Sequence, residues 1–157
     1  RVGYFSADLR MHPVATLTAE LYEVHDRTQF EVHAFSFGPD TNDEMNLRIK
    51  KGVDYFHNVI DMTHQEIAML SRSLEIDIAV DLTGLTAKSR TDVFAMSAAP
   101  IQLSYIGYLG TMGTDYYDSH DESSVLWNDP DLNIPWPIDN PQLSEKDSNA
   151  STLAGLK

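Results

Sequence analysis

The sequence contains no cysteine, no long apolar run and no excess of positive charge. The absence of cysteine excludes disulfides and thiolate metal sites, which is typical of a reducing compartment, so we expect a cytoplasmic protein. No window reaches the roughly 18 consecutive apolar residues of a membrane span, so we expect no membrane partner. A formal net charge of −13 repels phosphate backbones, and we therefore expect no nucleic-acid partner.

Signals for cofactors and metals are also missing. No G-x-G-x-x-G follows the first predicted strand, which argues against NAD and FAD, and we expect no cofactor. Five histidines lack a spacing to one another, or to carboxylates, that is typical of a metal site, so we expect no metal. These histidines are His25, His33, His57, His64 and His120.

Short apolar runs alternate with amphipathic segments along the first 106 residues. This alternation indicates βαβ crossovers, and it predicts an α/β fold with a Rossmann-like, mainly parallel five-stranded sheet. Strands are predicted at 2–6, 30–37, 55–60, 76–82 and 101–106, and helices at 14–24, 42–51, 65–74 and 90–97. Ligands of such sheets bind beyond the carboxyl ends of the strands, which directs attention to the loops at 8–12, 83–89 and 107–113.

Asp8 and His12 lie four residues apart in the loop that follows the first predicted strand. A carboxylate beside an imidazole can hold its tautomer and raise its basicity, as general acid–base chemistry requires. The spacing alone favours a structural interpretation, in which Asp8 caps a turn and His12 caps a helix that begins with Pro13.

Two further strand-end loops are rich in glycine. The loop 81–86 (DLTGLT) places a glycine turn and two hydroxyls at the end of a strand, and it suits either a hydrogen-bonding site or an ordinary turn. The loop 106–113 (IGYLGTMG) has three glycines, which allow the backbone to approach a ligand closely. On physical grounds alone, the sequence predicts an α/β domain with a polar crevice.

Three stretches of the chain together match a known pattern: RVGYFSADLRMHPV, DLTGLT and SRTDVFAMSAAPIQLSYIGYLGTMGTDYYD. Residues 1–118 resemble the first, acceptor-side lobe of the catalytic region of protein O-GlcNAc transferases of the SPINDLY kind. The resemblance implies one lobe of a GT-B glycosyltransferase that moves N-acetylglucosamine from UDP-GlcNAc to Ser or Thr of an acceptor protein. It also implies catalytic roles for His12 and Asp8 and substrate-binding roles for Gly84, Thr86, Ile106, Gly107 and Gly110.

The sequence departs from this family in three respects. Leu85 stands where the family has tyrosine, and Leu109 stands where it has proline. The lobe that holds the nucleotide sugar is not recognisable, so we expect a fragment that is inactive without a partner lobe. The alternative is a module that binds acceptor peptides or nucleotide sugars without catalysis.

The C-terminal part, residues 114–157, resembles the C-terminal end of dTDP-4-dehydrorhamnose 3,5-epimerase. The segment 114–118 suits both families, which indicates a junction there from a fusion, a deletion or an assembly error. We expect two parts, a lobe at 1–118 and an irregular tail at 119–157 that is no independent domain. An epimerase remnant is a further alternative, but the partner residues of that chemistry are absent, and we do not expect epimerase activity.

Overall fold

The computed structural model describes residues 1–108, 112–117, 130, 148–152 and 154 of the 157-residue chain. The chain divides into two units, Arg1–Asp118 and Ser119–Lys157. Most of the predicted tail lies outside the described residues, so the prediction that it is no independent domain stays a prediction. No helix in the described ranges is long and apolar enough to cross a membrane.

The first unit contains a five-stranded sheet in which every neighbouring pair of strands is parallel. The strand order is β3-β2-β1-β4-β5, so β1 lies at the centre. Val2 at the start of β1 pairs with Val32 on one side and with Ile78 on the other. The predicted fold class is confirmed, with strands β1 (Val2–Ser6), β2 (Val32–Ser36), β3 (Tyr55–Asn58), β4 (Ile78–Asp81) and β5 (Ile101–Ser104).

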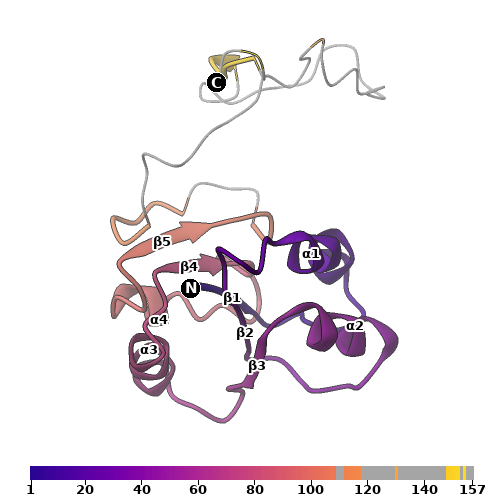
Figure 1. Ribbon diagram of the computed structural model, residues 1–157. Helices are drawn as coiled ribbons and strands as arrows, with labels where there is room; N and C mark the ends of the chain where they lie inside the picture. The colour runs from indigo at the N-terminus through magenta and orange to yellow at the C-terminus, as the bar shows by residue number, and fades with distance from the viewer. Residues whose placement is uncertain (109–111, 118–129, 131–147, 153, 155–157) are drawn as a thin grey trace. The chain divides into compact units, whose positions relative to one another are not determined.

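Helices cover both faces of the sheet. Figure 1 shows α1 and α2 on one side of the sheet and α3 and α4 on the other. Both faces of the central strands are therefore buried, which explains why their sequences are nearly continuous apolar runs. The helix bounds are α1 (Pro13–Val24), α2 (Glu44–Gly52), α3 (His64–Ser73) and α4 (Asp92–Ala95).

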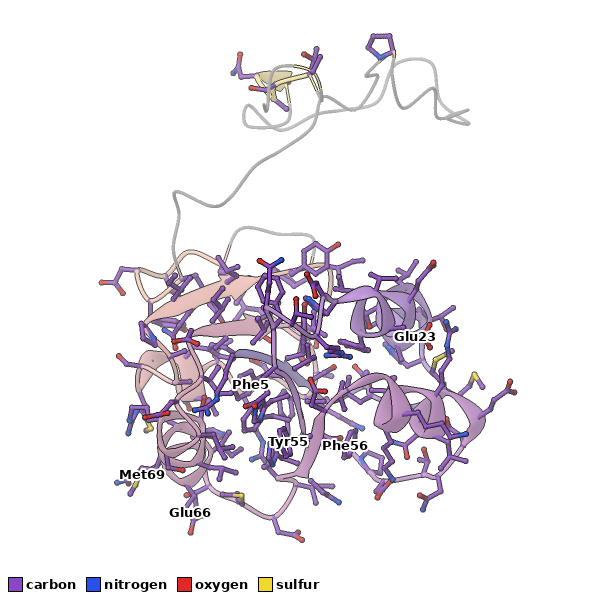
Figure 2. All side chains as sticks on the ribbon, in the orientation of Figure 1. Phe5, Glu23, Tyr55, Phe56, Glu66 and Met69 are labelled. Atoms are coloured by element: carbon purple, nitrogen blue, oxygen red, sulfur yellow. The ribbon has the colours of Figure 1, made fainter. Side chains whose placement is uncertain are left out.

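Side-chain caps mark the starts of α2 and α3. The Asp43 side chain accepts a hydrogen bond from the Asn46 amide at the start of α2. Thr63 and Glu66 form a capping box at the start of α3, in which each side chain binds the backbone of the other residue. Figure 2 shows Glu66 and Met69 on the outer side of α3, and Met69 is 54% exposed.

Alternation along β1 divides the core into two layers. Val2 and Tyr4 face α1 and α2, whereas Phe5 faces α3 and α4. The ring of Phe5 is fully buried and stacks on Phe35, with a centroid distance of 4.3 Å, and Phe94 meets it edge-on at 5.3 Å. These aromatic contacts join two central strands to α4.

The segment 112–117, which follows β5, is part of this core. Met112 and Tyr117 are both buried. The Gln102 side chain of β5 donates a hydrogen bond to the Tyr116 carbonyl, with an N···O distance of 2.7 Å. The segment 114–117, whose sequence suits two families, is thus packed against the α/β sheet.

Candidate active site

A cavity of about 250 Å³ opens at the carboxyl edge of the sheet, among the loops that follow β1, β4 and β5. Parallel strands end at one edge, so the loops that follow them meet there, as predicted. The cavity brings together four of the predicted site residues, and it adds others that the sequence did not single out. Its lining consists of Asp8, His12, Val14, Leu82, Thr83, Thr86, Ala87, Lys88 and Gly107.

The first turn of α2 holds the loop that follows β1. The Asn46 side chain donates to the Leu9 carbonyl at 2.7 Å, and the Asp43 carboxylate accepts from the Met11 amide at 2.9 Å. A hydrogen bond from Thr41, reinforced by the amides of Met11 and Asn46, lowers the pKa of Asp43 to about 2. Asp43 therefore stays ionised and keeps the residue before His12 in place.

Asp8 and His12 both line the cavity, but they do not form a hydrogen bond with each other. Asp8 Oδ2 lies 3.8 Å from His12 Nε2, which is within ion-pair range and too long for a hydrogen bond. The other carboxylate oxygen of Asp8 accepts from Arg10 at 3.1 Å, and the Asp8 amide donates to Ser6 Oγ at 3.0 Å. Arg10 thus balances the charge of Asp8.

The helix-capping interpretation of His12 is confirmed. His12 Nδ1 accepts a hydrogen bond from the Val14 amide at 3.3 Å, where Pro13 begins α1. A neutral imidazole that accepts at Nδ1 carries its proton on Nε2. In this arrangement Nε2 is a donor toward the cavity and Asp8, and it becomes a base only if the Val14 bond breaks and the tautomer changes.

The loop after β4 forms the opposite wall. Thr83 Oγ1 accepts from the Ala7 amide at 3.1 Å, which connects this wall to the loop that follows β1. Gly84 is buried and does not line the cavity, in contrast to Thr86. It has a φ of +56°, and a Cβ there would lie 2.4 Å from Tyr108 Cβ, so this position requires glycine for backbone reasons.

The turn after β5 brings backbone close to β4. A Cβ on Gly107 would lie 1.7 Å from the Leu82 carbonyl oxygen, so only glycine allows this approach. Ile106 does not line the cavity, and its φ of +53° is unusual for a β-branched residue. Such strain costs roughly 1–3 kcal/mol and concentrates at functional sites. The remaining predicted residue, Gly110, lies outside the described residues.

Lys88 is a cavity residue that the sequence analysis did not single out. It is exposed, and within the described part of the chain no acidic side chain pairs with it. Since Arg10 balances Asp8, Lys88 leaves the cavity with an unpaired positive charge on a strongly acidic chain. The sequence signal for this residue is a lysine in a strand-end loop of a strongly acidic chain. Among the described residues, no group of three or more His, Asp or Glu side chains could hold a metal ion.

A larger cavity of about 460 Å³ lies at the other end of the sheet, before β4 and β5, with Ile76 and Pro100 among its walls. Its charged groups are already engaged: Arg72 donates to the carbonyls of Met96 and Ser97 at 2.7 and 2.9 Å. Size alone does not indicate function, and we regard the smaller cavity, with its carboxylate, imidazole and free ammonium groups, as the candidate site.

Comparisons with known protein families point to two different ones. The profile of glycosyl transferase family 41 matches residues 1–125, and that of dTDP-4-dehydrorhamnose 3,5-epimerase matches residues 105–155. The two matches overlap at 105–125. Part of this overlap, 112–117, is packed into the α/β unit described above.

Individual relatives agree with the first match. The chain is 36% identical over 118 residues to a probable UDP-N-acetylglucosamine–peptide N-acetylglucosaminyltransferase, SEC, of Arabidopsis thaliana, covering 75% of this chain and 12% of that protein. It is 32% identical over 124 residues to the corresponding enzyme of Caenorhabditis elegans, covering 75% and 10%. A mutant O-GlcNAc transferase of Thermobaculum terrenum has a similar structure, with a TM-score of 0.72 and 35% identity over 75% of this chain and 22% of that one. The chain thus spans about a tenth of these curated relatives.

Proposed function

We propose that this chain, which belongs to glycosyl transferase family 41, is the acceptor-side lobe of an enzyme that transfers N-acetylglucosamine from UDP-GlcNAc to Ser or Thr of proteins. One observation carries the proposal. A single cavity gathers Asp8, His12, Thr86 and Gly107, residues from three separate loops to which the family resemblance assigns catalysis and substrate binding.

The chemistry of the cavity suits a sugar donor and a hydroxyl acceptor. The His12 Nε2–H group can donate to an oxygen of the sugar or of the acceptor, and Thr86 offers a further hydroxyl. The Lys88 ammonium group attracts an anion such as a phosphate of the donor. The Asp8 carboxylate, oriented by Arg10, provides a negative charge beside His12.

We further propose that the chain does not catalyse transfer by itself. Its cavity of about 250 Å³ is smaller than the roughly 300–1,000 Å³ of sites that enclose a ligand, so it forms one wall of a site rather than a whole one. Stabilisation of the leaving diphosphate is usually the largest contribution to such catalysis, and it requires preorganised groups facing the donor. We assign those groups to a partner lobe. The acceptor protein and the nucleotide sugar are the other two proposed partners.

A transfer assay tests this function. Labelled UDP-GlcNAc and a Ser/Thr-containing peptide are incubated with the chain alone, and then with the chain and a separately produced second lobe of a family member. We expect no transfer by the chain alone and restored transfer in the mixture. Transfer by the chain alone, or micromolar UDP affinity by calorimetry, contradicts the proposal that a partner lobe supplies the groups that hold the donor. No transfer in a mixture in which both lobes bind each other contradicts the function itself.

The charge at Lys88 offers a second test of the same site. We expect Lys88→Ala to weaken transfer in the two-lobe mixture, because it removes the unpaired cation from the cavity. Lys51→Ala is a matched control, since Lys51 is also an exposed lysine but lies in the last turn of α2, outside the cavity lining. Equal effects of the two substitutions contradict the role of Lys88.

A further inference from the structure

The carboxylate of Asp81, at the end of β4, is almost completely buried: the residue is 3% exposed. A buried carboxylate is costly unless hydrogen bonds replace its lost hydration. Asp81 receives three. Oδ1 accepts from the amides of Thr83 and Gly84 at 2.8 and 3.0 Å, and Oδ2 accepts from the hydroxyl of Tyr117 at 2.6 Å.

The two amide bonds fix the turn that leads into one wall of the cavity. Thr83 and Thr86 belong to that wall. Thr83 Oγ1 also accepts from the Ala7 amide, one residue before Asp8. The position of Thr83 therefore helps to fix the loop that forms the opposite wall. Asp81 itself does not line the cavity. Its hydrogen bonds to the Thr83 and Gly84 amides therefore hold one wall directly and the other wall through Thr83.

Tyr117 reaches Asp81 from a distant part of the chain, 36 residues later. It is 4% exposed, and its ring lies 5.3 Å from the ring of Phe94, centroid to centroid. Burial, and then the charge of Asp81, raises the pKa of the Tyr117 hydroxyl, which therefore remains a donor. Because this hydroxyl occupies Oδ2, Oδ1 is left to face the amides of Thr83 and Gly84.

We propose that Asp81 and Tyr117 are a pair of positioning residues, in which the Tyr117 hydroxyl orients the buried carboxylate so that it holds the 83–86 loop in the shape of the cavity wall. The functional meaning of this wall rests on the proposed glycosyltransferase site. Neither residue touches the cavity, so neither is a catalytic residue. The inference also means that a complete site requires the chain as far as Tyr117, within the overlap of the two family matches.

Amide hydrogen exchange in the 157-residue chain, followed by NMR, tests the pair. Tyr117→Phe removes the hydroxyl and keeps the ring. We expect exchange at the Thr83 and Gly84 amides to accelerate by roughly tenfold or more, as for the loss of a hydrogen bond to a charged group. We expect no comparable change at strand amides such as that of Phe35. The matched control is Tyr116→Phe, because the neighbouring tyrosine has no hydroxyl hydrogen bond within the described part of the chain, and it should leave Thr83 and Gly84 unchanged.

Two results overturn the proposal. Unchanged exchange at Thr83 and Gly84 in Tyr117→Phe shows that the hydroxyl does not orient the carboxylate. A uniform rise at all amides shows that Tyr117 contributes only to global stability.

Asp81→Asn provides an independent check, because asparagine keeps the shape and one acceptor oxygen but removes the charge. We expect faster exchange at the same two amides. We expect little further acceleration when Tyr117→Phe is added, because both substitutions weaken the same interaction between Tyr117 and Asp81. Fully additive effects contradict the pairing.

These exchange measurements need no substrate. If the transfer assay with a second lobe fails for the unsubstituted chain, the proposed function fails, and the exchange result still decides whether Asp81 and Tyr117 position the loop. If transfer succeeds, we expect Tyr117→Phe to raise the KM for substrate more than it lowers kcat, whereas Tyr116→Phe should change neither.

Discussion

Replacement of Gly107 by alanine is the most demanding test of how the strand-end loops pack. The added Cβ would lie 1.7 Å from the Leu82 carbonyl oxygen and 2.8 Å from the Thr83 amide nitrogen. Contacts of Cβ atoms under 3.0 Å essentially never occur, so the two backbones must separate by at least 1.3 Å, the difference between 3.0 and 1.7 Å. Both atoms belong to backbone, and neither can rotate away as a side chain would.

The energetic cost follows from what this separation disturbs. The Tyr105 amide donates to the Asp81 carbonyl at 2.9 Å, two residues before Gly107, and this bond would lengthen or break. The loss of one hydrogen bond costs about 1 kcal/mol, and backbone shifts that relieve overpacking cost about 1–3 kcal/mol or more. We therefore expect Gly107→Ala to lower the free energy of unfolding by about 2–4 kcal/mol.

Gly113→Ala is the matched control. Gly113 has a φ of +64°, but nothing lies within 4 Å of a Cβ added there, so only the conformational cost of about 1–2 kcal/mol applies. Urea denaturation followed by far-UV circular dichroism measures both variants. If the two free energies of unfolding agree within about 0.5 kcal/mol, the close approach of Gly107 to Leu82 does not exist in the protein, and the wall of the cavity is built differently.

Three further outcomes follow from the same structure. Thr63→Ala should lower the free energy of unfolding by about 1 kcal/mol in urea denaturation, because it removes half of the capping box of α3; no change would show that this helix start is frayed. Phe5→Ala should cost about 3–5 kcal/mol, since the ring is fully buried between Phe35 and Phe94, and a loss below 1 kcal/mol would contradict the central position of β1. Burial lowers the pKa of both His25 and His57 below the ordinary value of 6.5, so just below that pH the unfolded chain binds more protons than the folded chain. The urea midpoint should therefore fall as the pH decreases from about 7.5 to about 5.5, and an unchanged pH dependence in His57→Gln would contradict the contribution of His57.

Local patterns along the chain carried most of the information on the fold. Alternating strand and helix patterns predicted the nine elements that lie within the described residues 1–108, and the structure shifts their ends by only a few residues. The strand predicted at 30–37, for example, is β2, Val32–Ser36. Pro13 and the capping residues give local signals for helix starts, since their effect depends on neighbours in sequence. Parallel topology then places the loops after β1, β4 and β5 at one edge, so the position of the cavity was predictable too.

The internal geometry of the site was not predictable, because it depends on contacts between residues distant in sequence. The spacing of Asp8 and His12 indicated that both could face one crevice, but it did not indicate that Asp8 binds Arg10 or that His12 accepts from Val14. The resulting distance between Asp8 Oδ2 and His12 Nε2 is 3.8 Å. Likewise, the sequence left open whether Gly84 belongs to a hydrogen-bonding site or to an ordinary turn, and it gave no sign that a Cβ at this position would meet Tyr108.

The sequence by itself determined the α/β class, the order of the elements and the edge of the sheet where the site lies. Periodicity depends on the residues of a single segment, and each βαβ connection joins elements that follow one another in the chain. Only the tertiary structure decided that Tyr117 reaches back 36 residues to Asp81, and that Gly107 passes against Leu82. Burial makes such long-range contacts specific: a carboxylate without water must find its donors, and two backbones in contact leave no room for a Cβ.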